Sequence, residues 1–219
     1  MLSYTEENYL KAILHISSRI EDKKEAGTNE LAQHLAVKPA TVNNMLKKLK
    51  EKKLIHNERY GKIRLSVKGK SVALQVVRKH RLWETFLYEK LSFSWDEVHA
   101  VAEQLEHIQS EKLIERLDQF LGFPLFDPHG DPIPRKNGQI PEVSAVLLKE
   151  VALGKTVRVV AVRETQPGFL QYLEQLNIRI GTRLKVVGRV EFDESIQLKV
   201  GRMGVISVSK RFAENVLVG

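Results

Sequence analysis

Cysteine is absent from the 219 residues of this chain, and its absence excludes several kinds of site. Without thiols there can be no disulfide, no thiolate zinc site and no cysteine nucleophile, so any metal must be held by nitrogen and oxygen ligands. Long apolar runs are also lacking, since no stretch approaches the ~20 residues of a membrane helix. The N-terminal segment is amphipathic, unlike a signal peptide. We therefore expect a cytoplasmic protein that does not enter a membrane.

Positive charge, in contrast, is abundant and concentrated in one segment. Residues 37–70 contain eleven Lys or Arg and two acidic residues, a local charge of +9, whereas the whole chain carries a formal +8. A basic segment of this kind is typical of proteins that bind polyanions. An anionic membrane surface or RNA would attract it too, but the helical pattern around the segment favours DNA.

The N-terminal third has the pattern of a helix-turn-helix, in which a short helix and a tight turn precede a longer helix. Apolar residues at helical spacing predict a first helix that is capped by Thr5 and ends before Glu21. A short second helix follows Thr28. The third begins at Pro39, which suits the first position of a helix because its missing N–H would be unpaired there anyway.

Two short strands at 54–55 and 63–65, joined by a turn at Gly61, predict a basic wing beside the third helix. Residues 1–70 would then form a winged helix-turn-helix DNA-binding domain. Asn43 and Asn44 have amides suited to reading base edges, and the basic and hydroxyl side chains suit phosphates. The residues expected at the DNA are Thr28, Lys38, Pro39, Thr41, Asn43, Asn44, Lys47, Lys48, Arg59 and Lys62.

Three amphipathic helices are predicted next, near residues 68–90, 95–108 and 111–121. Two of them carry histidines and carboxylates at helical spacing. In a helix, positions i, i+4, i+7 and i+8 lie on one stripe, so two such stripes packed face to face would enclose a divalent cation. The two stripes are His80 with Glu84, and His99 with Glu103, Glu106 and His107.

Other interpretations of these stripes are a solvated salt-bridge face, with Lys79, Arg81 and Lys112 as partners, and an enzyme site. Burying the carboxylates without a cation would cost several kcal/mol per charge, which disfavours a metal-free core. A di-iron bundle needs Glu-x-x-His motifs, which this region lacks, and a zinc protease needs His-Glu-x-x-His. The sequence therefore favours a metal-binding protein that is not an enzyme.

The C-terminal part changes character. Residues 71–141 would form a helical dimerisation and metal-binding domain, closed by a loop rich in Pro and Gly at 122–134. Residues 142–152 read as a linker that can form an edge strand or a helical turn, and 153–219 as a small β-barrel. The expected strands are 157–162, 183–187, 196–200 and 205–208, with helical segments at 169–176 and 212–216.

Four motifs in this order carry a family resemblance, and they are Arg78-Lys79-His80-Arg81-Leu82-x-Glu84, Val98-His99, Glu106-His107 and Asp127-Pro-His-Gly-Asp-Pro-Ile-Pro134. Over essentially the whole chain, the sequence resembles the iron- and manganese-dependent repressors of the diphtheria toxin repressor and manganese transport regulator family. The resemblance implies a homodimer, a metal corepressor, a palindromic operator in double-stranded DNA, and a C-terminal barrel of SH3-like or ferrous-transport-accessory type. The fold class expected is mainly α with this small β domain.

Carried over by position, the resemblance also implies two ligand sets. The primary site would use Asn8, Glu103, Glu106 and His107, and the second site His80, Glu84 and His99. Three positions depart from the family. Glu103 stands where iron-type members have a sulfur ligand, Asn8 where they usually have Met or Asp, and Lys11 where manganese-type members often have a carboxylate. Near 164–169 the iron-type barrel adds ligands, for which Glu164 and Gln166 offer suitable atoms.

We therefore expect a metal-dependent transcriptional repressor that senses Mn(II), with Fe(II) second, through one or two ions per subunit. A ligand set of nitrogen and carboxylate oxygen suits both ions. The alternative is a metal-independent winged-helix regulator with a structural His/Glu cluster and a barrel that binds another protein. A metalloenzyme is a distant third.

Overall fold

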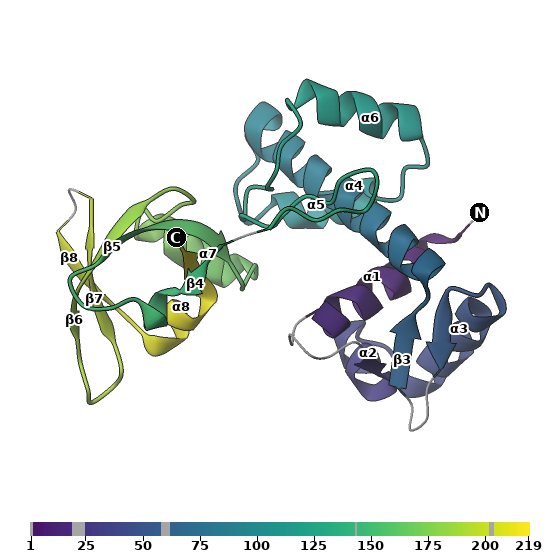
Figure 1. The fold of residues 1–219 in the computed structure, drawn as a ribbon, viewed down its shortest axis with the longest axis horizontal. Coiled ribbons are helices and arrows are strands. Elements are labelled where there is room, and N and C mark those ends of the chain that lie inside the picture. Colours follow the sequence, from purple (N-terminus) through teal and green to yellow (C-terminus); the bar gives the residue numbers. More distant parts are fainter. Residues whose placement is uncertain (1, 19–24, 58–61, 143, 202–203) are drawn as a thin grey trace. The chain divides into compact units, whose positions relative to one another are not determined.

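The computed structural model describes residues 2–18, 25–57, 62–142, 144–201 and 204–219, which form two compact units (Figure 1). The first unit takes in residues 1–80, 104–110 and 134–139. The second takes in residues 81–103, 111–133 and 140–219.

Three helices of the first unit build the predicted helix-turn-helix: α1 (Tyr4–Ser18), α2 (Thr28–His34) and α3 (Pro39–Glu51). Pro39 is the first residue of α3, as expected. The expected cap at Thr5 is wrong. Ser3 caps α1 instead, because Glu6 N donates to Ser3 Oγ (3.3 Å) while Ser3 N donates to Glu6 Oε2 (2.8 Å), a reciprocal capping box.

A three-stranded antiparallel sheet completes the winged helix. Its strands are β1 (Ala26–Gly27), β2 (Ile55–Asn57) and β3 (Lys62–Leu65), in the order β1-β3-β2. Two residues are too few for a pattern, so β1 was not foreseen. The expected turn at Gly61 and the candidate Arg59 lie outside the described residues.

One apolar core joins these helices to the sheet. On α1, Tyr9, Leu10 and Ile13 are buried because they share one face of the helix. They pack in one cluster with residues of α2, α3 and the sheet, namely Leu31, Val42, Leu46, Leu49, Leu54 and Ile63. Helix α1 is therefore part of the core of the winged helix itself.

The predicted middle helices are α4 (Val67–Leu91), α5 (Val98–Leu105) and α6 (Glu111–Phe120). The expectation of one helix as far as residue 108 is wrong, because α5 ends at Leu105 and leaves Glu106 and His107 in the turn after it. In the second unit the loop after α6 is fixed by Arg81 Nη1, which donates to Pro132 O (2.5 Å), and by Trp95 Nε1, which donates to Pro128 O (3.0 Å).

The second unit also contains a six-stranded sheet in the order β4-β9-β5-β6-β7-β8. Its strands and helices are β4 (Val146–Leu147), the 3-10 helix η2 (Leu148–Glu150), β5 (Thr156–Val162), α7 (Pro167–Gln175), β6 (Arg183–Arg189), β7 (Ile196–Val200), β8 (Val205–Val208), α8 (Lys210–Asn215) and β9 (Val216–Val218). Every strand expected here is present. The segment expected as a linker contains β4 and η2, and Leu148 is buried in the barrel core.

No helix in the described part of the chain is both long and apolar enough to span a membrane.

Gly69, in the first turn of α4, allows this helix to approach the strand region closely. A Cβ at this position would lie 1.9 Å from the backbone oxygen of Leu54. We expect Gly69→Ala to destabilise the first unit by about 1–3 kcal/mol, because backbone must shift, although alanine is intrinsically the better helix former by about 1 kcal/mol. Urea unfolding measures the change.

Gly168, in the first turn of α7, is the matched control, since nothing lies within 4 Å of its Cβ position. Gly168→Ala should be neutral or slightly stabilising. Equal effects of the two substitutions would contradict the close approach at Gly69.

Candidate metal centre

The carboxylate of Glu106 is the centre of a buried polar cluster in the first unit. Its side chain is fully buried, and its Oε2 atom lies 2.6 Å from His80 Nδ1 and 2.6 Å from Lys11 Nζ. Lys11 Nζ also lies 3.2 Å from His80 Nδ1. Helix α1, helix α4 and the turn after α5 thus meet at one carboxylate.

His107 is oriented by a second carboxylate in the same cluster. Its Nδ1 lies 2.6 Å from Glu7 Oε2, and its ring stacks on Tyr4 at 4.7 Å between centroids. Glu7 Oε1 accepts from Gln109 Nε2 (2.8 Å). With Nδ1 donating to Glu7, the lone pair of His107 lies on Nε2, which is 3.8 Å from Glu106 Oε1.

Two buried oxygens accept no hydrogen bond from the described residues: Glu106 Oε1 in this cluster, and Oδ1 of Asn8, which follows Glu7 on α1. Leaving a buried acceptor unsatisfied costs about 1–3 kcal/mol, and more for a charged group. Both atoms, like His107 Nε2, are electron-pair donors that a cation would satisfy. Nitrogen, amide and carboxylate ligands suit Mn(II) and Fe(II), so these residues fit the metal that the sequence predicts.

Lys79 brings a second ammonium group to the edge of the cluster. Its Nζ lies 4.0 Å from Glu7 Oε2, and its side chain is buried. Burial lowers the pKa of Lys79, while the negative charges of Glu7 and Glu106 partly oppose that shift. The cluster therefore holds two carboxylates and two lysines before any ion is considered.

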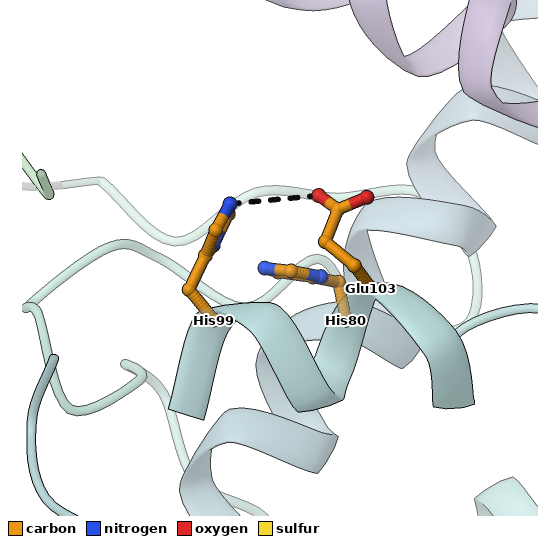
Figure 2. Close-up of side chains that lie close together, drawn as sticks. All are labelled: His80, His99 and Glu103. Atoms are coloured by element: carbon orange, nitrogen blue, oxygen red, sulfur yellow. Dashed lines mark ion pairs between the residues drawn. The ribbon is translucent and has the colours of Figure 1, made fainter. Parts of the chain in front are cut away.

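The residues predicted for the second site belong to both compact units. In the second unit, buried Glu84 lies with its Oε1 3.2 Å from His99 Nδ1. His99 Nε2 lies 3.6 Å from Glu103 Oε1, one turn further along α5 (Figure 2, which also draws His80). His80 belongs to the first unit, where it bonds Glu106.

Asp127 and His129 lie close to Glu84. Spacing in the sequence could not identify these two residues, because they lie in a loop. One ligand-type atom from each of the three buried residues lies within 4.8 Å of the others. Asp127 Oδ1 accepts from the backbone N–H groups of His129 (2.8 Å) and Asp131 (2.9 Å), so it shapes the loop. His129 Nε2 lies 3.1 Å from Trp95 O.

Burial sets the protonation of this second group. It raises the pKa of Asp127 well above its ordinary value, with the charges of Glu84 and Asp131 adding to the shift. It lowers the pKa of His129, although the charge of Glu84 acts in the opposite direction. The loop therefore presents a neutral ring to Glu84 near pH 7.

The barrel residues Glu164 and Gln166 lie at the start of α7. Gln166 caps this helix, and its backbone N–H donates to Glu164 Oε1 (3.0 Å). Their service as metal ligands stays a prediction.

The predicted DNA-binding face of α3 is exposed, while Val42, Leu46 and Leu49 on its other side are buried. Thr28 is half-buried at the start of α2, and Lys62 on β3 pairs with Glu25 (2.9 Å). The exposed candidates are Lys38, Pro39, Thr41, Asn43, Asn44, Lys47, Lys48 and Lys62.

Three family models match successive parts of the chain. Residues 1–63 match the family described as "Iron dependent repressor, N-terminal DNA binding domain" and residues 66–135 match "Iron dependent repressor, metal binding and dimerisation domain". Residues 146–219 match the FeoA domain.

Individual relatives agree with these matches. The iron-dependent repressor IdeR of Mycobacterium leprae is 33% identical over 197 residues, which are 85% of this chain and 80% of that protein. A solved manganese-dependent transcriptional repressor in complex with manganese is 36% identical, with a TM-score of 0.87 over 97% of this chain and 98% of its own. ScaR with bound Zn2+ is 29% identical, with a TM-score of 0.78 over 98% of both chains.

Glu7 was not among the residues predicted from the sequence, and its bond to His107 makes it testable. We expect Glu7→Gln to weaken Mn(II) binding roughly 10- to 100-fold, because a carboxylate behind a histidine ligand fixes the ring and raises its basicity. Calorimetric titration of the metal-free protein with Mn(II) measures this.

Glu6→Gln is the matched control, because Glu6 is the adjacent residue and bonds Lys52 (2.6 Å) outside this cluster. It should leave Mn(II) affinity within about twofold of the original protein. Unchanged affinity in Glu7→Gln would remove Glu7 from the site.

Proposed function

Because the chain belongs to the iron-dependent repressor family, we propose that it is a metal-dependent DNA-binding transcriptional repressor that responds to Mn(II) and, second, to Fe(II). The observation that carries this proposal is a pair of buried oxygens, Asn8 Oδ1 and Glu106 Oε1, that accept no hydrogen bond from the described residues. The named relatives that depend on manganese or iron support the choice of metal.

The proposed ligands keep the assignment made from the sequence. Asn8, Glu103, Glu106 and His107 would form the primary site, and His80, Glu84 and His99 the second, with one or two ions per subunit. The ion supplies concentrated positive charge. Glu7 holds the ring of His107, and Lys11 neutralises the far oxygen of Glu106.

Helix α1 links this cluster to DNA binding because its two faces have different partners. Tyr9, Leu10 and Ile13 are part of the winged-helix core, whereas Glu7 and Lys11 bond residues of the cluster. A change in how firmly the cluster holds α1 therefore also affects the helices that pack on α1, including the recognition helix α3.

We further propose that the protein acts in the cytoplasm as a homodimer on a palindromic operator. The match to a dimerisation domain and the exposed polar face of α3 support this. Two recognition helices related by a twofold axis would be spaced by about one turn of DNA, ~34 Å.

The second candidate is a metal-independent regulator. The bond between the ammonium group of Lys11 and Glu106 favours it, because this carboxylate already has a positively charged partner. DNA binding by chelator-treated protein, with and without added Mn(II), separates the two. Operator affinity that rises with Mn(II) supports the first candidate, and equal affinity supports the second.

Loss of a proposed ligand should uncouple DNA binding from metal. We expect His107→Ala and Glu106→Gln to lose at least roughly tenfold of the Mn(II) stimulation of operator binding, because each opens the coordination shell. Gel shift measures the stimulation, and circular dichroism with gel filtration checks the folded dimer. Glu111→Gln, which removes an exposed carboxylate at the start of α6, is the control. Full Mn(II) stimulation of operator binding in both ligand variants would contradict the assignment of Glu106 and His107 as ligands.

Replacing a base-reading residue of α3 should change DNA affinity in a different way from replacing a phosphate-binding residue. Asn43→Ala should cost ~1–3 kcal/mol mainly on the operator, whereas Lys47→Ala should weaken all DNA similarly and reduce the salt slope by about one unit. Titrations of operator and random DNA at several salt concentrations measure both effects. Equal losses on the two DNAs for Asn43→Ala would contradict its role.

A further inference from the structure

We propose that Lys11 is a built-in cation of the metal centre. Its ammonium group fills the position beside Glu106 Oε2 and His80 Nδ1, so that this cluster accepts one divalent ion, on the side of Glu106 Oε1, and binds it more weakly than the ligands alone would. The inference rests on the proposed function, which it deepens by naming what sets the metal affinity.

The two oxygens of the Glu106 carboxylate have different surroundings. Oε2 is shared by Lys11 Nζ and His80 Nδ1, both at 2.6 Å, so this oxygen is fully engaged. Oε1 accepts no hydrogen bond from the described residues and lies 3.8 Å from His107 Nε2. Only the Oε1 side therefore offers ligand atoms to an ion.

Lys11 is held in place and is not a surface lysine that happens to reach inward. Its side chain is 19% exposed, and it leaves α1 one turn after Glu7, on the same face. Glu7 is committed to His107 and Gln109, which leaves Glu106 as the carboxylate that Lys11 bonds. Helix geometry and the neighbouring bonds thus fix the ammonium group at this position.

The charge of the cluster gives the consequence. The carboxylates of Glu7 and Glu106 face the ammonium groups of Lys11 and Lys79, so these four side chains together carry no net charge before an ion enters. A divalent ion must then bind beside a fixed positive charge. Replacing Lys11 by a neutral residue leaves the cluster one charge more negative, which favours the ion.

Lys11→Met in the full-length chain tests the proposal, with MnCl2 as the probe after chelation. We expect calorimetry to show Mn(II) affinity raised roughly ten- to hundredfold, because a repulsive charge a few ångströms from the ion is removed. The metal-free protein should also unfold at a lower temperature, since Glu106 loses its partner. Lys11→Arg, which keeps the charge, should retain the original affinity.

Lys52→Met is the matched control. It also removes a lysine that bonds an α1 carboxylate at 2.6 Å, but that carboxylate is Glu6, which is not part of the cluster. Its Mn(II) affinity should stay unchanged. Lys11→Glu supplies a second measurement, because a carboxylate in place of the ammonium should raise the Mn(II) stoichiometry by one ion per chain.

The outcomes separate this inference from the proposed function. Unchanged Mn(II) affinity in Lys11→Met and unchanged stoichiometry in Lys11→Glu, with Mn(II)-stimulated DNA binding intact in the original protein, would overturn the role of Lys11 alone. An original protein that binds no Mn(II) would overturn the proposed function. In that case a lower unfolding temperature of metal-free Lys11→Met would still support the placement of the ammonium group, and an unchanged temperature would overturn it.

Discussion

Burial of the Glu106 carboxylate is the constraint on which the arrangement of the first unit depends. A carboxylate with no solvent exposure must be paired, because the cost of burying a lone charge is several kcal/mol or more. Its partners come from two other parts of the chain: Lys11 on α1 and His80 on α4. Satisfying one side chain therefore brings together α1, α4 and the turn after α5, and a change in the pairing of Glu106 changes how those parts are held.

The two faces of α1 turn this local pairing into a route to DNA. One face is apolar and belongs to the same core as α2 and α3, so α1 cannot move without disturbing the recognition helix. The other face carries Glu7, Asn8 and Lys11, which differ in charge and in strength as partners. Glu7 acts through His107, Lys11 neutralises Glu106, and Asn8 offers a neutral oxygen. Metal binding can bias DNA affinity only through contacts that differ between the two states, and Asn8 is the proposed ligand on α1 that can make such a contact.

Much of this architecture could be predicted from sequence because it follows from periodicity. The helix-turn-helix, the long α4 and the barrel strands each repeat apolar residues at a regular spacing. The fold class, and the family indicated by the resemblance of four motifs, are confirmed. The ligand set stays a prediction, and its details show where spacing fails. Two adjacent acids, Glu6 and Glu7, look alike in the sequence, yet one pairs with Lys52 and the other with His107. Spacing also extended α5 past Leu105, because a turn residue such as His107 still fits the helical stripe. Asp127 and His129 were missed since loop residues have no period at all.

The side chains of α1 affect the affinity for metal and the response of DNA binding to metal in different ways. Glu106 and His107 lie in one turn and hold their positions through bonds to Lys11 and Glu7. The proposed ligand Asn8 has an uncharged amide, so the ion would gain less from reaching α1 than it would from a carboxylate there. An ion shifts an equilibrium only by the difference in its affinity for the two states, so a weak ligand on α1 limits that shift. Lys11 also limits the shift that an ion can cause, because its bond to Glu106 already holds α1 against the cluster without metal.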